Sequence, residues 1–146
     1  MFRFRLQQVL ELREKQERHL ATQLAAALDV ERAAKNALSG LRAERESGAD
    51  GIRDGEAHSV GELANLAFIM QQLDDRIAGA RDEVCAANDC VSHVKEALTA
   101  AFKDRRVLDR LRERHEETYR AAADQTDRRT MDDIALSRFV HNDNNQ

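Results

Sequence analysis

The sequence predicts an all-α protein in which two long helices pair as an antiparallel coiled-coil hairpin, with the second helix longer than the first. Three observations favour this fold class. The 146 residues include no proline and are mostly helix formers, with 34% charged and only 4% aromatic residues. Apolar residues recur every three or four positions in two long stretches. One glycine-rich segment separates these stretches, so we expect a single coiled-coil domain over residues 1–146.

The first helix is expected over about residues 4–46. Its apolar seam is interrupted, because Arg13, Glu17 and Glu31 take positions that a regular coiled coil fills with apolar side chains. The apolar members of the seam are Leu6, Leu10, Leu20, Leu24, Ala27, Leu38 and Leu41. The pattern therefore indicates a partner helix, but it specifies the register only weakly.

A connection is expected over residues 47–58. Four of the six glycines lie in the segment 47–61, and glycine is a poor residue for a helix interior. The next helix should begin at Ser59, because Ser59 and Glu62 have the spacing of a capping box, in which each side chain bonds the other's backbone amide. A connection of about a dozen residues can return the second helix antiparallel to the first.

The second helix is expected from Ser59 to about residue 140, followed by a disordered tail over 141–146. Its seam fills about six heptads without interruption. The members of this seam are Leu63, Leu66, Met70, Leu73, Ile77, Ala80, Val84, Ala87, Val91, Val94, Leu98 and Ala101. Beyond Arg105 the pattern continues as Leu108, Leu111, Thr118 and Ala122, and it drifts around the helix.

The expected turn also fixes a register. If residues near 47 and 59 face each other, Leu10 lies near residue 96 and Phe2 near residue 104. Roughly 35 residues of the second helix, about 50 Å long, would then extend beyond the first. An isolated helix is only marginally stable in water, so the apolar groups of this segment are expected to need another protein.

Composition and motifs argue against several function classes. A formal net charge of −4 gives no overall basic field for nucleic acid or acidic membranes. No apolar stretch is long enough for a signal peptide or a membrane span, so a cytosolic protein is expected. The motifs GxxxxGK[ST], GxGxxG, HExxH and CxxC are absent, so we expect neither an enzyme nor a cofactor.

Two small groupings have spacings that could suggest chemistry. Cys90 and His93 share a helix side, but a zinc site needs at least three protein ligands, so we assign no metal. The stretch RHEETY brings His115, Glu116 and Tyr119 together without a pocket, which favours a solvated or partner-binding helix face over a catalytic role.

Two cysteines and one basic stretch have no pattern that requires a chemical role. Cys85 and Cys90 lie about 140° apart around a helix, so they are expected to be free thiols in a reducing compartment. The stretch KDRRVLDRLRER, residues 103–114, interleaves acids with bases and has no aromatic stacking platform. It therefore favours a solvated or protein-facing helix surface over nucleic-acid binding.

The two ends of the chain carry a family resemblance. The opening FRFRLQQVLELREKQE places a phenylalanine-basic-phenylalanine stretch before a leucine-rich helix, and the chain closes with RVLDRLRERHEETYRAAADQTDRRTMDDIALSRF. In order, spacing and total length these stretches resemble the flagellar export protein FliJ family, which typically closes with an LRER…Y stretch and a (L/M)DE-A--RF box. Asp109 and Asp133 stand where glutamate is commoner in that family.

The resemblance implies a soluble, non-enzymatic component of the flagellar type III export apparatus, similar to the central stalk of rotary ATP synthases. It would be cytoplasmic and peripheral to the inner membrane at the flagellar base. The implied partners are the hexameric export ATPase FliI, the export gate protein FlhA and the chaperones of export substrates. Its implied role in motility is to couple ATP hydrolysis to export and to escort or recycle those chaperones.

Candidate contacts follow from this resemblance together with the expected helix ends. We assign contacts with the ATPase ring to Phe2, Phe4, Leu108, Arg110, Leu111, Arg112, Arg114, Tyr119, Met131, Asp132, Ile134 and Phe139, with the arginines facing acidic loops of the ring. The resemblance maps the gate contact to Ile69, Leu73, Arg76 and Ala80. Leu73 and Ala80 also fall on the internal seam and are expected to be core, so Ile69 and Arg76 are the better gate candidates.

Two alternatives stay open. A stalk of a virulence-type secretion system would have the same architecture. A self-associating coiled-coil scaffold without an ATPase partner would also bury the exposed stripe, and it should sediment as a stable dimer or larger at micromolar concentration.

Overall fold

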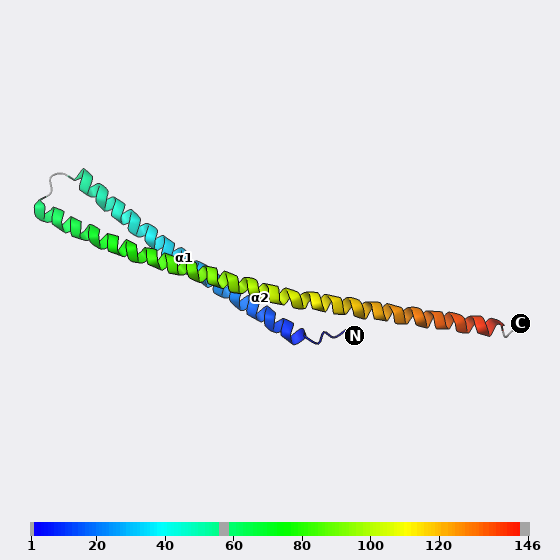
Figure 1. Cartoon of the computed structure of the whole chain (residues 1–146). Coiled ribbons are helices and arrows are strands. Elements are labelled where there is room, and N and C mark those ends of the chain that lie inside the picture. The colour runs from blue at the N-terminus through cyan, green and yellow to red at the C-terminus, as the bar shows by residue number, and fades with distance from the viewer. Residues whose placement is uncertain (1, 56–58, 144–146) are drawn as a thin grey trace. The chain divides into compact units, whose positions relative to one another are not determined.

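The computed structural model describes residues 2–55 and 59–143, with side chains as far as residue 139. It contains two helices, α1 (Gln7–Asp54) and α2 (Val60–Asp143), and no strand in the described part of the chain. The two helices run antiparallel and pack against each other (Figure 1). This confirms the predicted all-α hairpin with a longer second helix.

Contacts divide the chain into two compact units, and both helices contribute to each. Unit 1 comprises Met1–Gln16 and Ala101–Gln146, and unit 2 comprises Glu17–Ala100. The expectation of a single domain stays a prediction.

Unit 2 has a narrow apolar seam as its core. Leu38 of α1 packs with Ile77 and Ala80 of α2, and Leu41 and Val84 border this cluster. Every predicted member of the α2 seam from Leu66 to Ala101 is buried or half-buried, whereas Leu63 at the start is exposed. The heptad pattern of α2 therefore predicted its buried side correctly.

Unit 1 packs the start of the chain against α2. Leu10 is the most buried large side chain among the described residues, with 1% of its surface exposed. Arg13, which interrupts the α1 seam, is half-buried and pairs with Asp104 of α2 at 3.3 Å. Position 13 thus stays on the packed side of α1 because its charge has a partner across the hairpin.

The helix boundaries near the turn differ from the prediction. Helix α1 continues through Gly48 and Gly51 to Asp54, so the connection expected over 47–58 is mostly helix. Gly48 faces Met70, whose sulfur would lie only 3.3 Å from a Cβ at position 48, and Ile52 is half-buried. Packing against α2 therefore offsets the cost of about 1 kcal/mol that each glycine carries within a helix.

The start of α2 follows the prediction. The Ser59 amide donates to Oε2 of Glu62 at 2.9 Å, and the Glu62 amide donates to the Ser59 hydroxyl at 3.3 Å. These two bonds confirm the capping box. At the other end, α2 runs to Asp143, so the predicted disordered tail is wrong for residues 141–143, and residues 144–146 lie outside the described residues.

The longer first helix changes the register. Phe2 lies against Tyr119 rather than near residue 104, and Arg13 rather than Phe2 pairs with Asp104. The predicted register is therefore wrong, because it placed the turn too early in the chain. The part of α2 that extends beyond Phe2, the first described residue, begins after Tyr119 and is shorter than expected.

Candidate protein-binding surfaces

Aromatic residues at the start of the chain pack inside unit 1. The rings of Phe2 and Tyr119 are 5.7 Å apart between centroids, and Phe4 meets the His115 ring edge-on at 5.9 Å. Phe4 is buried, with 8% of its surface exposed. Burial and aromatic contact on this scale stabilise a short helix pair. These side chains therefore hold the start of the chain against α2, at the end of the hairpin away from the turn. Tyr119 was expected to lie beyond the paired helices without an internal partner, and this expectation is wrong.

The two leucines assigned to ring contacts also lie within the two-helix part. Leu108 and Leu111 are half-buried, and their positions fall between Asp104, which pairs with Arg13, and His115, which meets Phe4. The sequence placed them beyond the end of α1, which the register contradicts.

A basic groove lies beside the aromatic pairs. It encloses about 610 Å³ and is lined by Phe2, Arg3, Phe4, Arg5, Gln7, Gln8 and Arg112. Arg110 and Arg114 are exposed nearby in the sequence. Arg3 and Arg5 were not among the predicted site residues, although their alternation with Phe2 and Phe4 is the signal that could have identified them. Guanidinium groups beside aromatic rings suit carboxylates of a protein partner.

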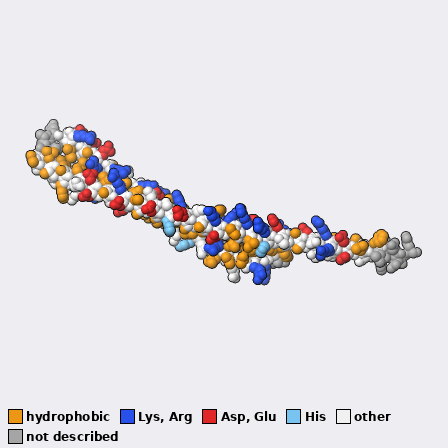
Figure 2. Space-filling view, viewed as in Figure 1, with side chains coloured by type: hydrophobic (Ala, Val, Ile, Leu, Met, Phe, Trp, Pro, Cys, Tyr) orange, Lys and Arg blue, Asp and Glu red, His pale blue; other side chains and the backbone are white. Residues whose placement is uncertain are grey.

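The last third of α2 is exposed over its whole circumference. Every described side chain from residue 117 to 139 is exposed, including Met131 at 70%, Ile134 at 44% and Phe139 at 68%, and Asp132 lies among them. Hydrogen bonds within this segment come from its own side chains. The hydroxyls of Thr126, Thr130 and Ser137 each donate a hydrogen bond to the backbone carbonyl four residues earlier. Figure 2 shows apolar and charged side chains interspersed along this end of α2.

The residues assigned to the gate divide as expected between core and surface. Ala80 is buried in the Leu38 cluster and Leu73 is half-buried. Ile69 is 44% exposed, and Arg76 is exposed as well. The packing of Leu73 and Ala80 in the seam is therefore confirmed, and Ile69 and Arg76 remain accessible to a partner.

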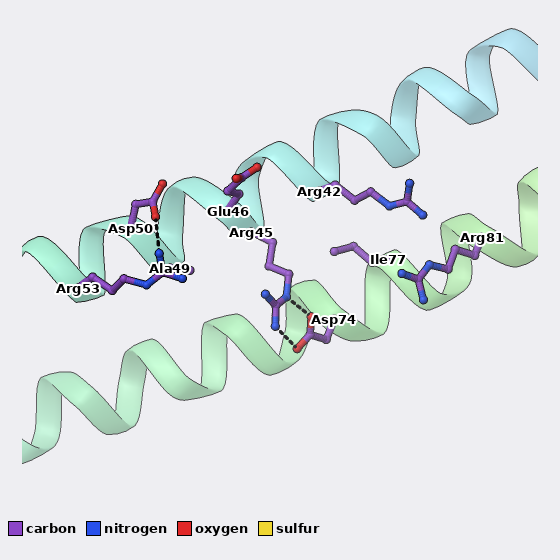
Figure 3. Close-up of a pocket in the computed structure, with 9 residues that line it drawn as sticks. All are labelled: Arg42, Arg45, Glu46, Ala49, Asp50, Arg53, Asp74, Ile77 and Arg81. Atoms are coloured by element: carbon purple, nitrogen blue, oxygen red, sulfur yellow. Dashed lines mark hydrogen bonds and ion pairs between the residues drawn. The ribbon is translucent and has the colours of Figure 1, made fainter.

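An arginine-rich groove lies on one side of the seam of unit 2 (Figure 3). It encloses about 650 Å³ and is lined by Arg42, Arg45, Glu46, Ala49, Asp50, Arg53, Asp74, Ile77 and Arg81. We refer to it as the arginine groove. No pattern in the sequence indicates this groove, because its residues come from both helices and have no local spacing.

Ion pairs hold part of the arginine groove. Arg45 donates from Nε and Nη2 to the two carboxylate oxygens of Asp74, and Arg53 pairs with Asp50 at 3.3 Å. Hydrogen bonding and charge from Arg45 hold the pKa of Asp74 below its ordinary value, and Arg81 acts in the same direction. The bidentate geometry of the Arg45–Asp74 pair links α1 to α2.

Residues that could suggest chemistry have structural contacts instead. Glu116 pairs with Arg120 at 2.6 Å, while His115 and Tyr119 pack against phenylalanine rings. Cys85 and Cys90 are free and exposed. Within the described ranges, no three His, Cys, Asp or Glu side chains gather as a metal site would require. Within these ranges, no helix is long and apolar enough to cross a membrane.

The basic stretch 103–114 contains acids that form ion pairs with arginines. Arg105 pairs with Asp109 at 2.7 Å and lies over the Phe102 ring, 5.5 Å from its centroid. Asp104 pairs with Arg13. Two of the three interleaved acids, Asp104 and Asp109, are therefore engaged by arginines, one from α1 and one from the stretch itself.

Comparison with known proteins gives one match. A family model described as the flagellar FliJ protein matches residues 1–144. No curated protein and no solved structure matches the chain.

Proposed function

The chain belongs to the flagellar FliJ protein family, and from that premise we propose that it is a stalk-like component of the flagellar type III export apparatus. Members of this family are non-catalytic components of flagellar export. In our proposal the protein is cytoplasmic, lies at the flagellar base, binds the export ATPase FliI and the gate protein FlhA, and escorts substrate chaperones. Through these contacts it couples ATP hydrolysis to export.

The main support for the proposed ATPase contact is the exposure of the last third of α2. Met131, Ile134 and Phe139 expose about half or more of their surface on a helical segment whose described side chains are all exposed. Burying one such side chain is worth about 1.5–3 kcal/mol, so a surrounding partner would gain considerably by enclosing them. We therefore place the apolar contacts with the ATPase ring on this segment, with Asp132 beside them.

The basic groove of unit 1 supports a second part of the same contact. Arg112 lines this groove, and Arg110 and Arg114 are exposed on another side of α2. Guanidinium groups of this kind suit acidic loops of a ring. Phe2, Phe4, Leu108, Leu111 and Tyr119 contribute in this proposal by fixing the shape of the shaft end, because their side chains pack wholly or partly inside unit 1.

The gate contact is proposed for the exposed flank of α2 in unit 2. Ile69 and Arg76 lie seven residues apart and therefore on the same side of the helix, beside the buried seam. Leu73 and Ala80 support this flank from the seam itself. An apolar side chain and a guanidinium group are the two contacts that this surface offers to FlhA.

One specific observation also favours self-association. A second copy of the chain could cover the exposed apolar residues of α2 as well as a ring could. The scaffold alternative predicts a stable dimer at micromolar concentration by sedimentation. The stalk proposal predicts a monomer that acquires its partner from the ATPase. Membership of the flagellar family favours a flagellar stalk over a virulence-type one.

The test is the ATPase rate of purified FliI from the same organism with and without this protein, together with size-exclusion chromatography of the mixture. We expect stimulation and co-elution. Met131→Gln with Ile134→Gln should weaken stimulation about tenfold or more, because two apolar contacts are lost while helix propensity is kept. The matched control is Val30→Gln, which removes an exposed apolar side chain of unit 2, outside the proposed ring contact. If both variants stimulate like the parent protein, the ring contact lies elsewhere.

A further inference from the structure

Four arginines and three acids line the arginine groove, and two of the arginines form no ion pair with these acids. Arg45 is held by Asp74, and Arg53 by Asp50. Neither Arg42 nor Arg81 forms an ion pair with another residue in the described part of the chain, although the field of Arg81 acts on Asp74. These two side chains therefore keep their guanidinium donors available to a ligand.

The two arginines approach the groove from different helices. Figure 3 shows Arg42 extending from α1 and Arg81 from α2 on either side of Ile77, while Glu46 points away from α2. Ile77 is 5% exposed, so the floor between them is closed by a packed apolar side chain. The groove runs along α1 from Arg42 to Arg53, or about 16 Å, which is three turns of a helix.

We propose that the arginine groove docks an acidic helical segment of a protein partner, with carboxylates of that segment bound by Arg42 and Arg81. A valley between two paired helices is the place where a third helix packs. Guanidinium forks bind carboxylates with defined geometry.

The charges of the groove favour a peptide over a continuous polyanion. Asp50 and Asp74 lie among the arginines, so their carboxylates would repel the closely spaced phosphates of a nucleic-acid backbone. A helical segment can instead place single carboxylates beside the two available arginines.

This surface is distinct from the contacts proposed above. Asp74 and Arg81 lie on one side of the buried seam of α2, whereas Ile69 and Arg76 lie on the other, as the helical period requires. The ATPase contacts belong to unit 1. Loss of docking in the groove would therefore leave the stalk proposal standing, and the reverse also holds.

The experiment is fluorescence anisotropy of the full chain with a labelled amphipathic peptide made of Glu, Ala and Leu. A version with Lys in place of Glu controls for charge. We expect salt-sensitive binding of the acidic peptide only. Arg42→Gln with Arg81→Gln should weaken it roughly fivefold to tenfold, whereas Arg32→Gln with Arg106→Gln, which removes the same charge elsewhere, should leave it within about twofold. Glutamine keeps helix propensity, so the variants should fold.

A second variant tests the groove by an expected increase in affinity for the acidic peptide. Asp74→Asn removes a repelling carboxylate and releases Arg45, so the acidic peptide should bind about twofold to fivefold tighter. Equal weakening by both double variants, or no tightening with Asp74→Asn, would overturn the proposal. Tighter, groove-dependent binding of a DNA duplex or of phosphatidylglycerol vesicles would overturn it too, because the ligand would then be a polyanion.

Discussion

The middle of α2 and its last third are built from similar residue types, yet only the middle has a partner helix. Between Leu66 and Leu111 the apolar side chains of the seam are buried or half-buried. Between residues 117 and 139 every described side chain is exposed, although the helix continues. Helix formation is therefore a local property of this chain, whereas burial depends on the length of α1 and on the position of the turn.

The largest expected contrast between the two regions is in amide hydrogen exchange. Amides of residues 80–98 should exchange about a thousandfold or more slowly than those of 121–139, because only the former need opening of the hairpin. The measurement is exchange followed by mass spectrometry on the free chain, with sedimentation establishing a monomer. Equal protection in a monomer would contradict the comparison.

Substitution by aspartate should destabilise the protein in the middle of α2 much more than in its last third. Ile77→Asp should destabilise the protein by about 3–5 kcal/mol, because it puts an unpaired charge at a site that is 5% exposed. Ile134→Asp should cost less than about 1 kcal/mol, because position 134 remains in water. Urea unfolding followed by circular dichroism measures both. Similar losses would mean that the last third of α2 is packed in the free protein.

A smaller contrast is expected between hydroxyl groups at the two ends of α2. Ser59→Ala should cost about 1 kcal/mol, because it removes the side-chain acceptor of the Glu62 amide. Ser137→Ala should be neutral or slightly stabilising, since the Ser137 hydroxyl bonds the Asp133 carbonyl within the helix and alanine is a better helix former. Thermal unfolding compares the two, and equal effects would argue against the cap.

The smallest expected effect is a pH dependence from Asp74. Arg45 lowers its folded-state pKa below the ordinary value of 3.8, so the stabilisation is present above pH 3.8 and is lost as pH falls through the folded-state pKa. NMR titration should give a pKa below 3.8, which Arg45→Gln should raise towards that value. Arg53→Gln, which removes a groove arginine that pairs elsewhere, is the control. A pKa that Arg45→Gln does not change would remove the assigned cause.

The candidate surfaces were predictable to different degrees. Met131, Ile134 and Phe139 were identified because an apolar pattern continued past any partner, and they are exposed. Phe4, Leu108 and Leu111 were assigned to the same surface, but the true register packs them within unit 1 wholly or in part. The arginine groove was missed, because Arg45 and Asp74 meet across the hairpin and no spacing within one helix indicates such a pair.

By itself the sequence determined the helical class, the seam of α2 and the cap at Ser59, because propensity, heptad period and capping act over a few residues. The tertiary structure decided where α1 ends, which residues face Phe2 and Phe4, and which arginines share a groove. These features depend on the balance between the cost of Gly48 and Gly51 in a helix and the packing gained along α2. That balance is set only when the two helices meet.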